Sequence, residues 1–286
     1  MKNIQDTINT IFTNKNATIK TRLLGGMMNE TYIISSDEKD YVLFVPQGNA
    51  NDVVDREEEK FVQNIASNLG ITSKNIYFNV ESGIKCHEFI EGSSLNLIND
   101  FDYELIAKML KIFHSSKTLS HYDYCPFDKL DGYLNQVLSF TTLGNDFYSL
   151  LNVLKESKDF LMSQKKTLCH NDFQKSNVVK TSDNNYYMID FEFVANNDPI
   201  YDIAAFGNNS VPEGRKLLDA YFGSPTQEEI KRYYLWRVFI SLQWSLMALI
   251  KDHNGEGKIH NIDFMSVSKF FLENAKEARG GLANGN

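Results

Sequence analysis

The sequence has few cysteines and no excess of positive charge. Its three cysteines, Cys86, Cys125 and Cys169, lie far apart and form no Cys-x-x-Cys pair. This pattern excludes a disulfide framework and a zinc knuckle, and it suits a reducing cytoplasm. The net charge is −8, from 29 Lys and Arg against 37 Asp and Glu. We therefore expect neither a nucleic-acid binder that neutralises phosphates nor a protein held on anionic lipid.

Long apolar runs are also lacking. The first residues do not contain the apolar stretch of a signal peptide. The longest apolar stretch, 238–250, is interrupted by Ser241, Gln243 and Ser245, which makes it too short and too polar to span a bilayer. The sequence therefore predicts a cytoplasmic protein without membrane insertion, and it leaves the oligomeric state open.

What is present is enough apolar material for a substantial core, since 42% of the 286 residues are hydrophobic. That length suits one large domain or two small ones. Residues 1–92 favour a small β-rich N-terminal lobe, and residues 93–286 a larger, mainly helical C-terminal lobe, so the predicted fold class is α+β. The expected helices are 4–13, 52–69, 103–113, 146–162, 227–251 and one within 261–286 that ends in a frayed glycine-rich stretch. The expected strands are 17–24, 31–35, 41–45, 75–80 and 84–90, with a compact β-rich interval at 168–190.

The residues that carry chemistry are concentrated at 168–192. His170, Asp172 and Asn177 form the pattern His-x-Asp-x4-Asn, and an apolar run then ends in Asp190-Phe191-Glu192. Phosphoryl transfer from ATP uses one Asp to take the proton of the acceptor hydroxyl, and an Asn and a second Asp to hold metal ions. Such oxygen ligands are the ones that Mg²⁺ prefers.

Five segments together resemble one known family, the choline/ethanolamine kinases, and most closely the bacterial Lic-type choline kinases. The similarity covers roughly residues 20–250 and includes the wider group of aminoglycoside phosphotransferases and protein-kinase-like enzymes. It implies a bilobal protein-kinase-like fold, ATP and Mg²⁺ as cofactors, and the hydroxyl group of a small amino alcohol, choline above all, as acceptor. The segments are His170–Val179, Tyr186–Phe193, Asp198–Phe206, Leu24–Tyr32 and Asp55–Glu59.

The resemblance also implies roles for single residues. Asp172 would be the catalytic base, His170 would brace its loop, and Asp202 would tie that loop down from the next helix. Asn177 and Asp190 would be the Mg²⁺ ligands. The implied nucleotide-binding residues are Gly25, Gly26 and Asn29 around the phosphates, Glu59 on the helix, and Glu88 and Ile90 at the hinge that meets adenine. The implied acceptor-binding residues are Glu192, Asn209, Trp244 and Met247, with Tyr201, Tyr233, Tyr234 and Trp236 as further aromatic candidates.

Simpler interpretations exist for several of these residues. Gly25-Gly26 between two strands is typical of a plain hairpin. Asp202 before an apolar helix could serve as a cap, and Trp244 could belong to the core. A thiol nucleophile at Cys169 is not expected, because no second catalytic His or oxyanion element is evident. The remaining histidines have no metal-ligand spacing.

One departure from the family pattern affects the nucleotide site. The third strand usually carries a basic residue that contacts the α- and β-phosphates and pairs with the helix glutamate, here Glu59. Phe44 stands at that position, and no Lys or Arg lies within two residues of it. We therefore expect Glu59 to lack its usual cationic partner. A pseudokinase or ligand-binding protein with impaired turnover is the first alternative, and an aminoglycoside-type phosphotransferase is the second.

Overall fold

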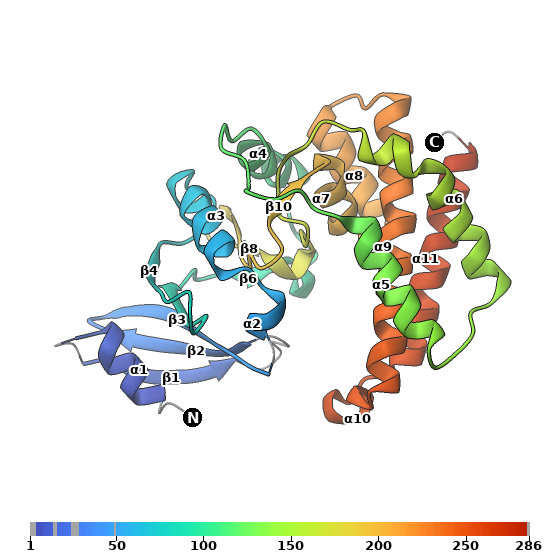
Figure 1. Cartoon of the computed structure of the whole chain (residues 1–286). Helices are drawn as coiled ribbons and strands as arrows, with labels where there is room; N and C mark the ends of the chain where they lie inside the picture. The colour runs from blue at the N-terminus through green and yellow to red at the C-terminus, as the bar shows by residue number, and fades with distance from the viewer. Residues whose placement is uncertain (1–3, 14–15, 24–28, 49, 285–286) are drawn as a thin grey trace. The chain divides into compact units, whose positions relative to one another are not determined.

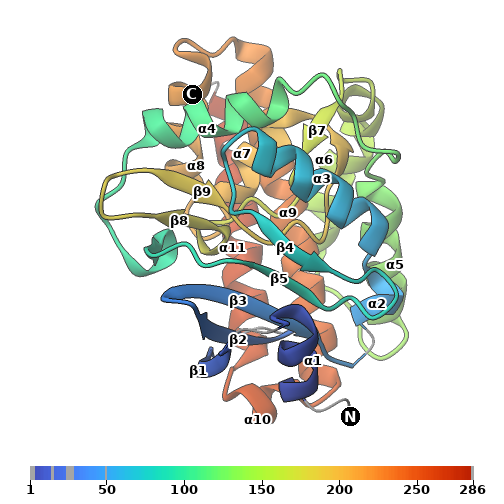
Figure 2. The ribbon, with the colours of Figure 1, turned by 90° about the vertical axis from the view of Figure 1, so that its left-hand side faces the viewer.

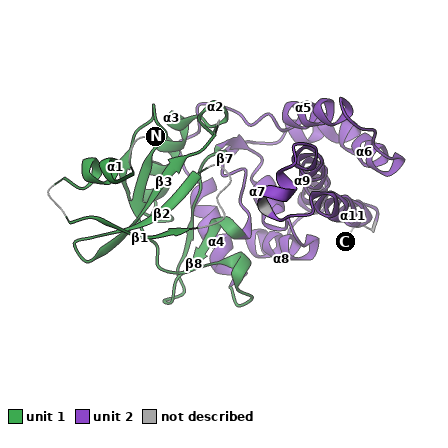
Figure 3. Cartoon of the chain, turned by 90° about the horizontal axis from the view of Figure 1, so that it is seen from below, with its two compact units in different colours: residues 1–101, 176–194 green, residues 102–175, 195–286 purple. Residues whose placement is uncertain are grey.

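The computed structural model describes residues 4–13, 16–23, 29–48 and 50–284 (Figure 1). The chain divides into two compact units, residues 1–101 with 176–194 and residues 102–175 with 195–286 (Figure 3). Segment 176–194 thus belongs to the first unit, whereas the predicted lobes place it with the second. The reason lies in strand pairing, because Ser93 and Ser94 pair with Lys180 and Val179.

The first unit is built on a five-stranded antiparallel sheet in the order β1-β2-β3-β5-β4 (Figure 2). A tight turn at Asp37 and Glu38, both with positive φ, joins β2 to β3, as the polar segment between the two predicted strands suggests. Ile34 and Leu43 are fully buried and pack with Ile8 of α1 (Ile4–Ile11). The strands are β1 (Thr18–Leu23), β2 (Asn29–Ser36), β3 (Lys39–Pro46), β4 (Asn75–Phe78) and β5 (Lys85–Glu88).

Two helices replace the single helix predicted over 52–69. They are α2 (Ala50–Val53) and α3 (Arg56–Asn68). The break falls at Asp55, whose extended backbone lets its carboxylate accept a hydrogen bond from the Glu58 amide at 3.0 Å. This is the geometry of an N-cap, so the new helix starts there. Its end is where the sequence predicts it, since Gly70 takes a positive φ of 73°.

A small sheet completes the first unit. Its strands are β6 (Ser93–Ser94), β8 (Val178–Lys180) and β9 (Tyr186–Met188), flanked by the short helices η1 (Leu95–Leu97) and η2 (Lys175–Asn177). The β8–β9 hairpin holds Asn177 at its start and Asp190 just beyond its end. The Ile189 amide donates to the Asn177 carbonyl at 3.0 Å. The hairpin therefore brings together two candidate metal ligands that are 13 positions apart in the chain.

The second unit is mainly helical, as predicted. The helix α9 begins with a capping box between Thr226 and Glu229, and α11 packs along it (Figure 1). The strands β7 (Thr167–Cys169) and β10 (Ala195–Asn197) form a two-stranded sheet. The helices are α4 (Tyr103–His114), α5 (Pro126–Leu138), α6 (Asn145–Met162), α7 (Pro199–Phe206), α8 (Val211–Phe222), α9 (Gln227–His253), α10 (Glu256–His260) and α11 (Phe264–Asn284).

The C-terminal glycine-rich stretch is helical, although the sequence predicts that it is frayed. Helix α11 continues through Gly280 and Gly281. A Cβ atom at Gly281 would overlap the ring of Tyr234, so the glycine lets α11 approach α9 closely. Within the ranges that the structure describes, every helix is too short or too polar to cross a membrane.

Candidate active site

The loop that carries the His-x-Asp-x4-Asn pattern is anchored by a buried carboxylate in the second unit. Asp202, in the first turn of α7, is fully buried. It accepts hydrogen bonds from the backbone amides of His170 (2.8 Å) and Asn171 (2.7 Å), and from Nε2 of His114 (3.0 Å). Asn171 adopts a positive φ of 61°. Because backbone groups of the loop are held directly, its conformation is specified by Asp202 rather than by solvent contacts.

Asp172 is positioned by groups within the same unit. Its Oδ1 accepts from Nε2 of Gln174 at 2.7 Å, and its own amide donates to Nδ1 of His170 at 3.3 Å. Gln174 is held in turn, since its Oε1 accepts from Nδ2 of Asn208 at 3.1 Å. Sequence reasoning missed Gln174 and Asn208. Gln174 could have been found from its position two residues after Asp172. No signal in the sequence points to Asn208.

The predicted acceptor residues of this unit lie in two places. Asn209 is exposed, whereas the neighbouring Asn208 is the buried one. Trp244 and Met247 occupy the same face of α9 and are both half-buried. The Trp244 ring stacks on Phe271 of α11, with centroids 5.7 Å apart and an interplanar angle of 22°. Trp236, one of the further aromatic candidates, is fully buried and donates through Nε1 to Asp198 at 2.9 Å, which is a core role.

A second group of metal-ligand residue types lies beneath this loop. His114, Cys169 and Asp202 offer ligand atoms within 4.8 Å of one another. Burial raises the pKa of the Cys169 thiol well above its usual range, and Asp202 adds to the effect. The thiol donates to the Asn197 carbonyl, and its protonated state suits neither a metal ligand nor a nucleophile.

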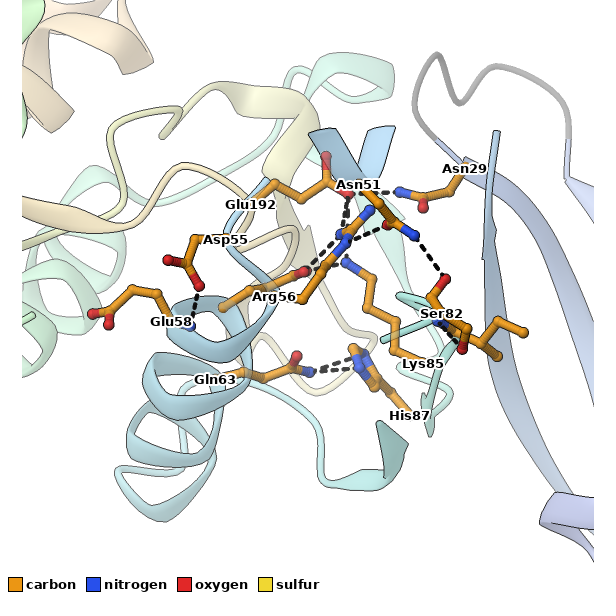
Figure 4. A network of polar contacts seen from close by, with 12 residues as sticks. Asn29, Asn51, Asp55, Arg56, Glu58, Gln63, Ser82, Lys85, His87 and Glu192 are labelled. Atoms are coloured by element: carbon orange, nitrogen blue, oxygen red, sulfur yellow. Dashed lines mark hydrogen bonds and ion pairs between the residues drawn. The ribbon is translucent and has the colours of Figure 1, made fainter. Parts of the chain in front are cut away.

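In the first unit, five charged residues form a cluster, which we call the charge cluster: Arg56, Glu59, Lys85, Asp190 and Glu192. Glu59 is fully buried and pairs with Lys85 through Oε1 and with Arg56 through Oε2, the latter at 2.7 Å. Glu192 accepts from Nη1 of Arg56 at 3.3 Å, and its Oε1 lies 3.6 Å from Nζ of Lys85. Figure 4 shows Arg56 of α3, Lys85 of β5 and Glu192 from the segment after β9 pointing toward one another.

The prediction that Glu59 lacks a cationic partner is therefore wrong. Lys85 of β5 lies directly opposite Phe44 of β3 in the antiparallel register. The side chains of directly opposite residues project from the same face of a sheet. The cation thus comes from the neighbouring strand, which a search along β3 alone does not find.

The other predicted nucleotide-binding residues have varied positions. The side chain of Asn29 is buried and donates from Nδ2 to Glu192 at 2.7 Å (Figure 4). The amide of Glu88 is used within the sheet, where it donates to the Lys74 carbonyl at 3.0 Å, and Ile90 is half-buried just beyond β5. Gly25 and Gly26 lie outside the described residues.

The charge cluster offers a set of oxygen ligands. The carboxylates of Glu59, Asp190 and Glu192 have oxygen atoms within 4.8 Å of one another. Glu59 and Glu192 are buried and engaged by cations, whereas Asp190 is exposed and adopts a positive φ of 70°. The donor chemistry of Asp190 and the nearby amide of Asn177 fits Mg²⁺, which takes one or two carboxylates in nucleotide sites.

Two opposing influences act on the ionisation of Asp190. Desolvation raises its pKa first, Glu192 raises it further, and Lys85 opposes the rise. The exposed surface of the side chain points the other way, because water screens an accessible carboxylate. Asp190 is therefore the carboxylate of the cluster that is open to a cation.

His87, next to the charge cluster, is expected to make stability depend on pH. Burial, with a contribution from Lys85, lowers its pKa to about 3, while Nε2 of Gln63 lies 2.8 Å from its ring nitrogen. The unfolded chain binds a proton near pH 6.5 and the folded chain does not, so stability is complete above pH 6.5 and falls as the pH decreases toward 3. Because the ring keeps some solvent exposure, we expect a loss of about 1–2 kcal/mol between pH 7 and pH 5.

Urea unfolding of the native chain and of His87→Gln at these two pH values measures this effect. Gln cannot titrate and still offers an acceptor to Gln63. The variant is expected to lose less stability on acidification than the native chain. An equal loss in both proteins would show that His87 is not the titrating group.

Comparisons with known proteins identify the family and the fold. A family model described as Choline/ethanolamine kinase matches residues 20–213. Protein LicA of Haemophilus influenzae is 24% identical over 254 residues, which cover 82% of this chain and 74% of that protein. Such a match spans far more than the catalytic motifs.

Solved structures show the fold. A choline/ethanolamine kinase family protein from Mesorhizobium loti has a TM-score of 0.79 at 19% identity, covering 99% of both chains. Choline kinase LicA from Streptococcus pneumoniae has a TM-score of 0.72 at 22% identity, covering 98% of both chains. A structure of LicA in complex with AMP has the same TM-score and identity, covering 99% of this chain and 98% of that one. The predicted α+β, protein-kinase-like fold is thus confirmed, and because the family model spans most of its length, this chain belongs to the choline/ethanolamine kinase family.

Proposed function

We propose that the protein transfers the γ-phosphoryl group of ATP to the hydroxyl group of a small amino alcohol, with choline as the first candidate. The observation that carries the proposal is the anchored loop that presents Asp172. Its backbone is held by Asp202, and the carboxylate of Asp172 is oriented by Gln174. Catalysis of phosphoryl transfer depends mainly on positioning and electrostatics, which such a loop supplies.

Within this proposal the residues of each unit have separate tasks. Asp172 accepts the proton of the acceptor hydroxyl as the oxygen attacks phosphorus. Asn177 and Asp190 hold Mg²⁺. When bound, Mg²⁺ neutralises negative charge on the phosphates. Asn29 and Arg56 hold Glu192 in place beside these ligands.

An active enzyme is favoured over a pseudokinase by the charge cluster. The main reason for suspecting impaired turnover was Phe44, and with it a glutamate without a cation. Glu59 has two cations, Lys85 and Arg56. Burying a carboxylate without partners would be strongly unfavourable, and the cluster avoids that cost while keeping a lysine at the site.

The acceptor is proposed from chemistry rather than from a bound ligand. A quaternary ammonium is held by aromatic faces and nearby carboxylates. Trp244 is half-buried, which leaves part of its ring accessible, and Met247 lies one helical turn away. Together with Glu192 and Asn209, they remain the proposed acceptor-binding residues.

The test is an ADP-release assay with Mg·ATP and a panel of acceptors that contains choline, ethanolamine, other amino alcohols and an aminoglycoside. We expect turnover with amino alcohols and the highest kcat/KM for choline. Tetramethylammonium is the matched control, because it has the same cationic head without a hydroxyl group and must give only background ADP release. Binding of Mg·ATP without turnover on any acceptor would favour the ligand-binding alternative, and preference for the aminoglycoside would favour the antibiotic phosphotransferase.

A further inference from the structure

The lysine of β5 stands beside the position at which β3 lacks a cation. Phe44 and Lys85 are directly opposite residues in the antiparallel pairing of β3 with β5. Directly opposite Cβ atoms on the same face lie only about 4.5–5.5 Å apart. A long side chain from residue 85 therefore reaches the region that a lysine at position 44 would serve.

The contacts of Lys85 hold its ammonium group on that face. The side chain is 2% exposed and pairs with Glu59, the glutamate that the usual β3 lysine would contact. Its Nζ also lies 5.0 Å from the centroid of the Phe44 ring. This distance is within the range of a cation–π interaction. The Phe44 ring on β3 therefore stabilises the ammonium group of Lys85 on β5.

The surrounding carboxylates complement the charge of this lysine. Glu59 pairs with its ammonium group, and Oε1 of Glu192 lies 3.6 Å from Nζ. Asp190 is the exposed carboxylate of the cluster and the proposed Mg²⁺ ligand. If Asp190 holds a cation, that cation would attract phosphate groups to the carboxylates that surround the Lys85 ammonium.

We propose that Lys85 is the residue that binds the α- and β-phosphates of ATP in this protein, in place of the absent basic residue at position 44. The inference rests on the proposed function, since it assumes that ATP is the phosphoryl donor. It assigns Phe44 a supporting role beneath the ammonium group. Glu59 would then orient Lys85, as it would orient a lysine on β3.

A purely structural role for Lys85 is the competing explanation. In that case the lysine would only neutralise Glu59, a task that it shares with Arg56. Loss of such a residue would lower the free energy of unfolding without changing the affinity of the folded protein for nucleotide. The two explanations therefore differ in nucleotide affinity, not in stability.

The experiment compares Lys85→Met with Lys39→Met, which removes an exposed lysine from β3. Titration calorimetry with Mg·ADP and steady-state kinetics with varied ATP are the readouts, and thermal unfolding checks that each variant is folded. We expect Lys85→Met to lose about 10²–10³-fold in kcat/KM for ATP and about tenfold or more in Mg·ADP affinity. Lys39→Met is expected to match the native chain.

A charge exchange addresses variants that fail to fold. The double variant Phe44→Lys/Lys85→Phe returns the lysine to β3 and keeps a lysine facing Glu59, with Arg56 unchanged. We expect it to recover at least about tenfold of the kcat/KM that Lys85→Met or Lys85→Phe loses. The single variant Phe44→Lys removes the ring that supports Lys85 and places a second ammonium group beside it, so we expect its turnover to be no higher than that of the native chain.

Two results would overturn the inference. One is a folded Lys85→Met variant with native ATP kinetics and native Mg·ADP affinity. The other is a gain of more than about tenfold in turnover for Phe44→Lys, which would show that the phosphate contact is missing in the native chain. Failure of the native chain itself to bind Mg·ADP would instead contradict the proposed function, so the two failures are distinguishable.

Discussion

Replacing Asp172 with alanine is expected to lower kcat by about 10²–10⁴-fold, the usual contribution of a positioned general base. The affinity for Mg·ADP should stay within about threefold of that of the native chain, because the proposed metal ligands, Asn177 and Asp190, are unchanged. A loss that falls on kcat and not on nucleotide binding is the signature of an interaction made in the transition state. Steady-state kinetics with choline and calorimetry with Mg·ADP provide the two measurements.

Asp123→Ala is the matched control for this prediction. Asp123 lies in the same unit, and its exposed carboxylate pairs with Lys166 at 2.7 Å. An exposed ion pair contributes little, so this variant is expected to keep native kinetics. Undiminished turnover in Asp172→Ala would sink the proposed mechanism. A drop in Asp123→Ala of the same size would show that the effect is not specific to the catalytic loop.

Replacing Asp202 with alanine is expected to cost about 3–5 kcal/mol in the free energy of unfolding. The carboxylate is fully buried and accepts from two backbone amides and a histidine. Alanine would leave all of these donors without an acceptor, and each buried unsatisfied group costs about 1–3 kcal/mol. Urea unfolding followed by circular dichroism measures the change.

Asp202→Asn refines the test. An amide has one acceptor oxygen, so one of the two loop amides would face an N–H group instead of an oxygen. We expect a loss of about 2–4 kcal/mol together with a lower kcat, because the backbone that positions Asp172 is no longer held on both sides. Asp219→Asn is the control, since Asp219 forms an exposed pair with Arg215 on α8 and should change stability by less than about 0.5 kcal/mol. Equal stability of Asp202→Asn and the native chain would contradict the anchoring role.

Local signals mark the ends of helices where neighbours in the chain decide the structure. Asp55 and Gly70 lie at the two ends of α3, because an N-cap carboxylate and a residue with positive φ act within one helical turn. The capping box at Thr226 similarly marks the start of α9. The predicted helix over 52–69 was wrong only at its N-terminal side, where the apolar periodicity continues across the Asp55 cap.

The short motifs in the sequence also carry the proposed chemistry. His170, Asp172 and Asn177 are close together in the chain, so one loop carries them regardless of how the rest of the protein packs. Gln174 and Asn208 escaped notice because the link between them spans 34 residues. Ordinary amides at that separation become meaningful only when folding brings their side chains together.

The charge cluster shows where sequence reasoning ends. Phe44 by itself suggested a lost cation and an unpaired Glu59, whereas Glu59 pairs with Lys85 and Arg56. Lys85 lies 41 residues beyond Phe44, on a strand whose register with β3 no local pattern reveals. The sequence by itself determined the family and the fold class, since the motifs that resemble the family lie in short segments and the helices and strands follow local periodicity. Only the tertiary structure decided that Lys85 neutralises Glu59, because hydrogen bonding between β3 and β5 sets which side chains share a face.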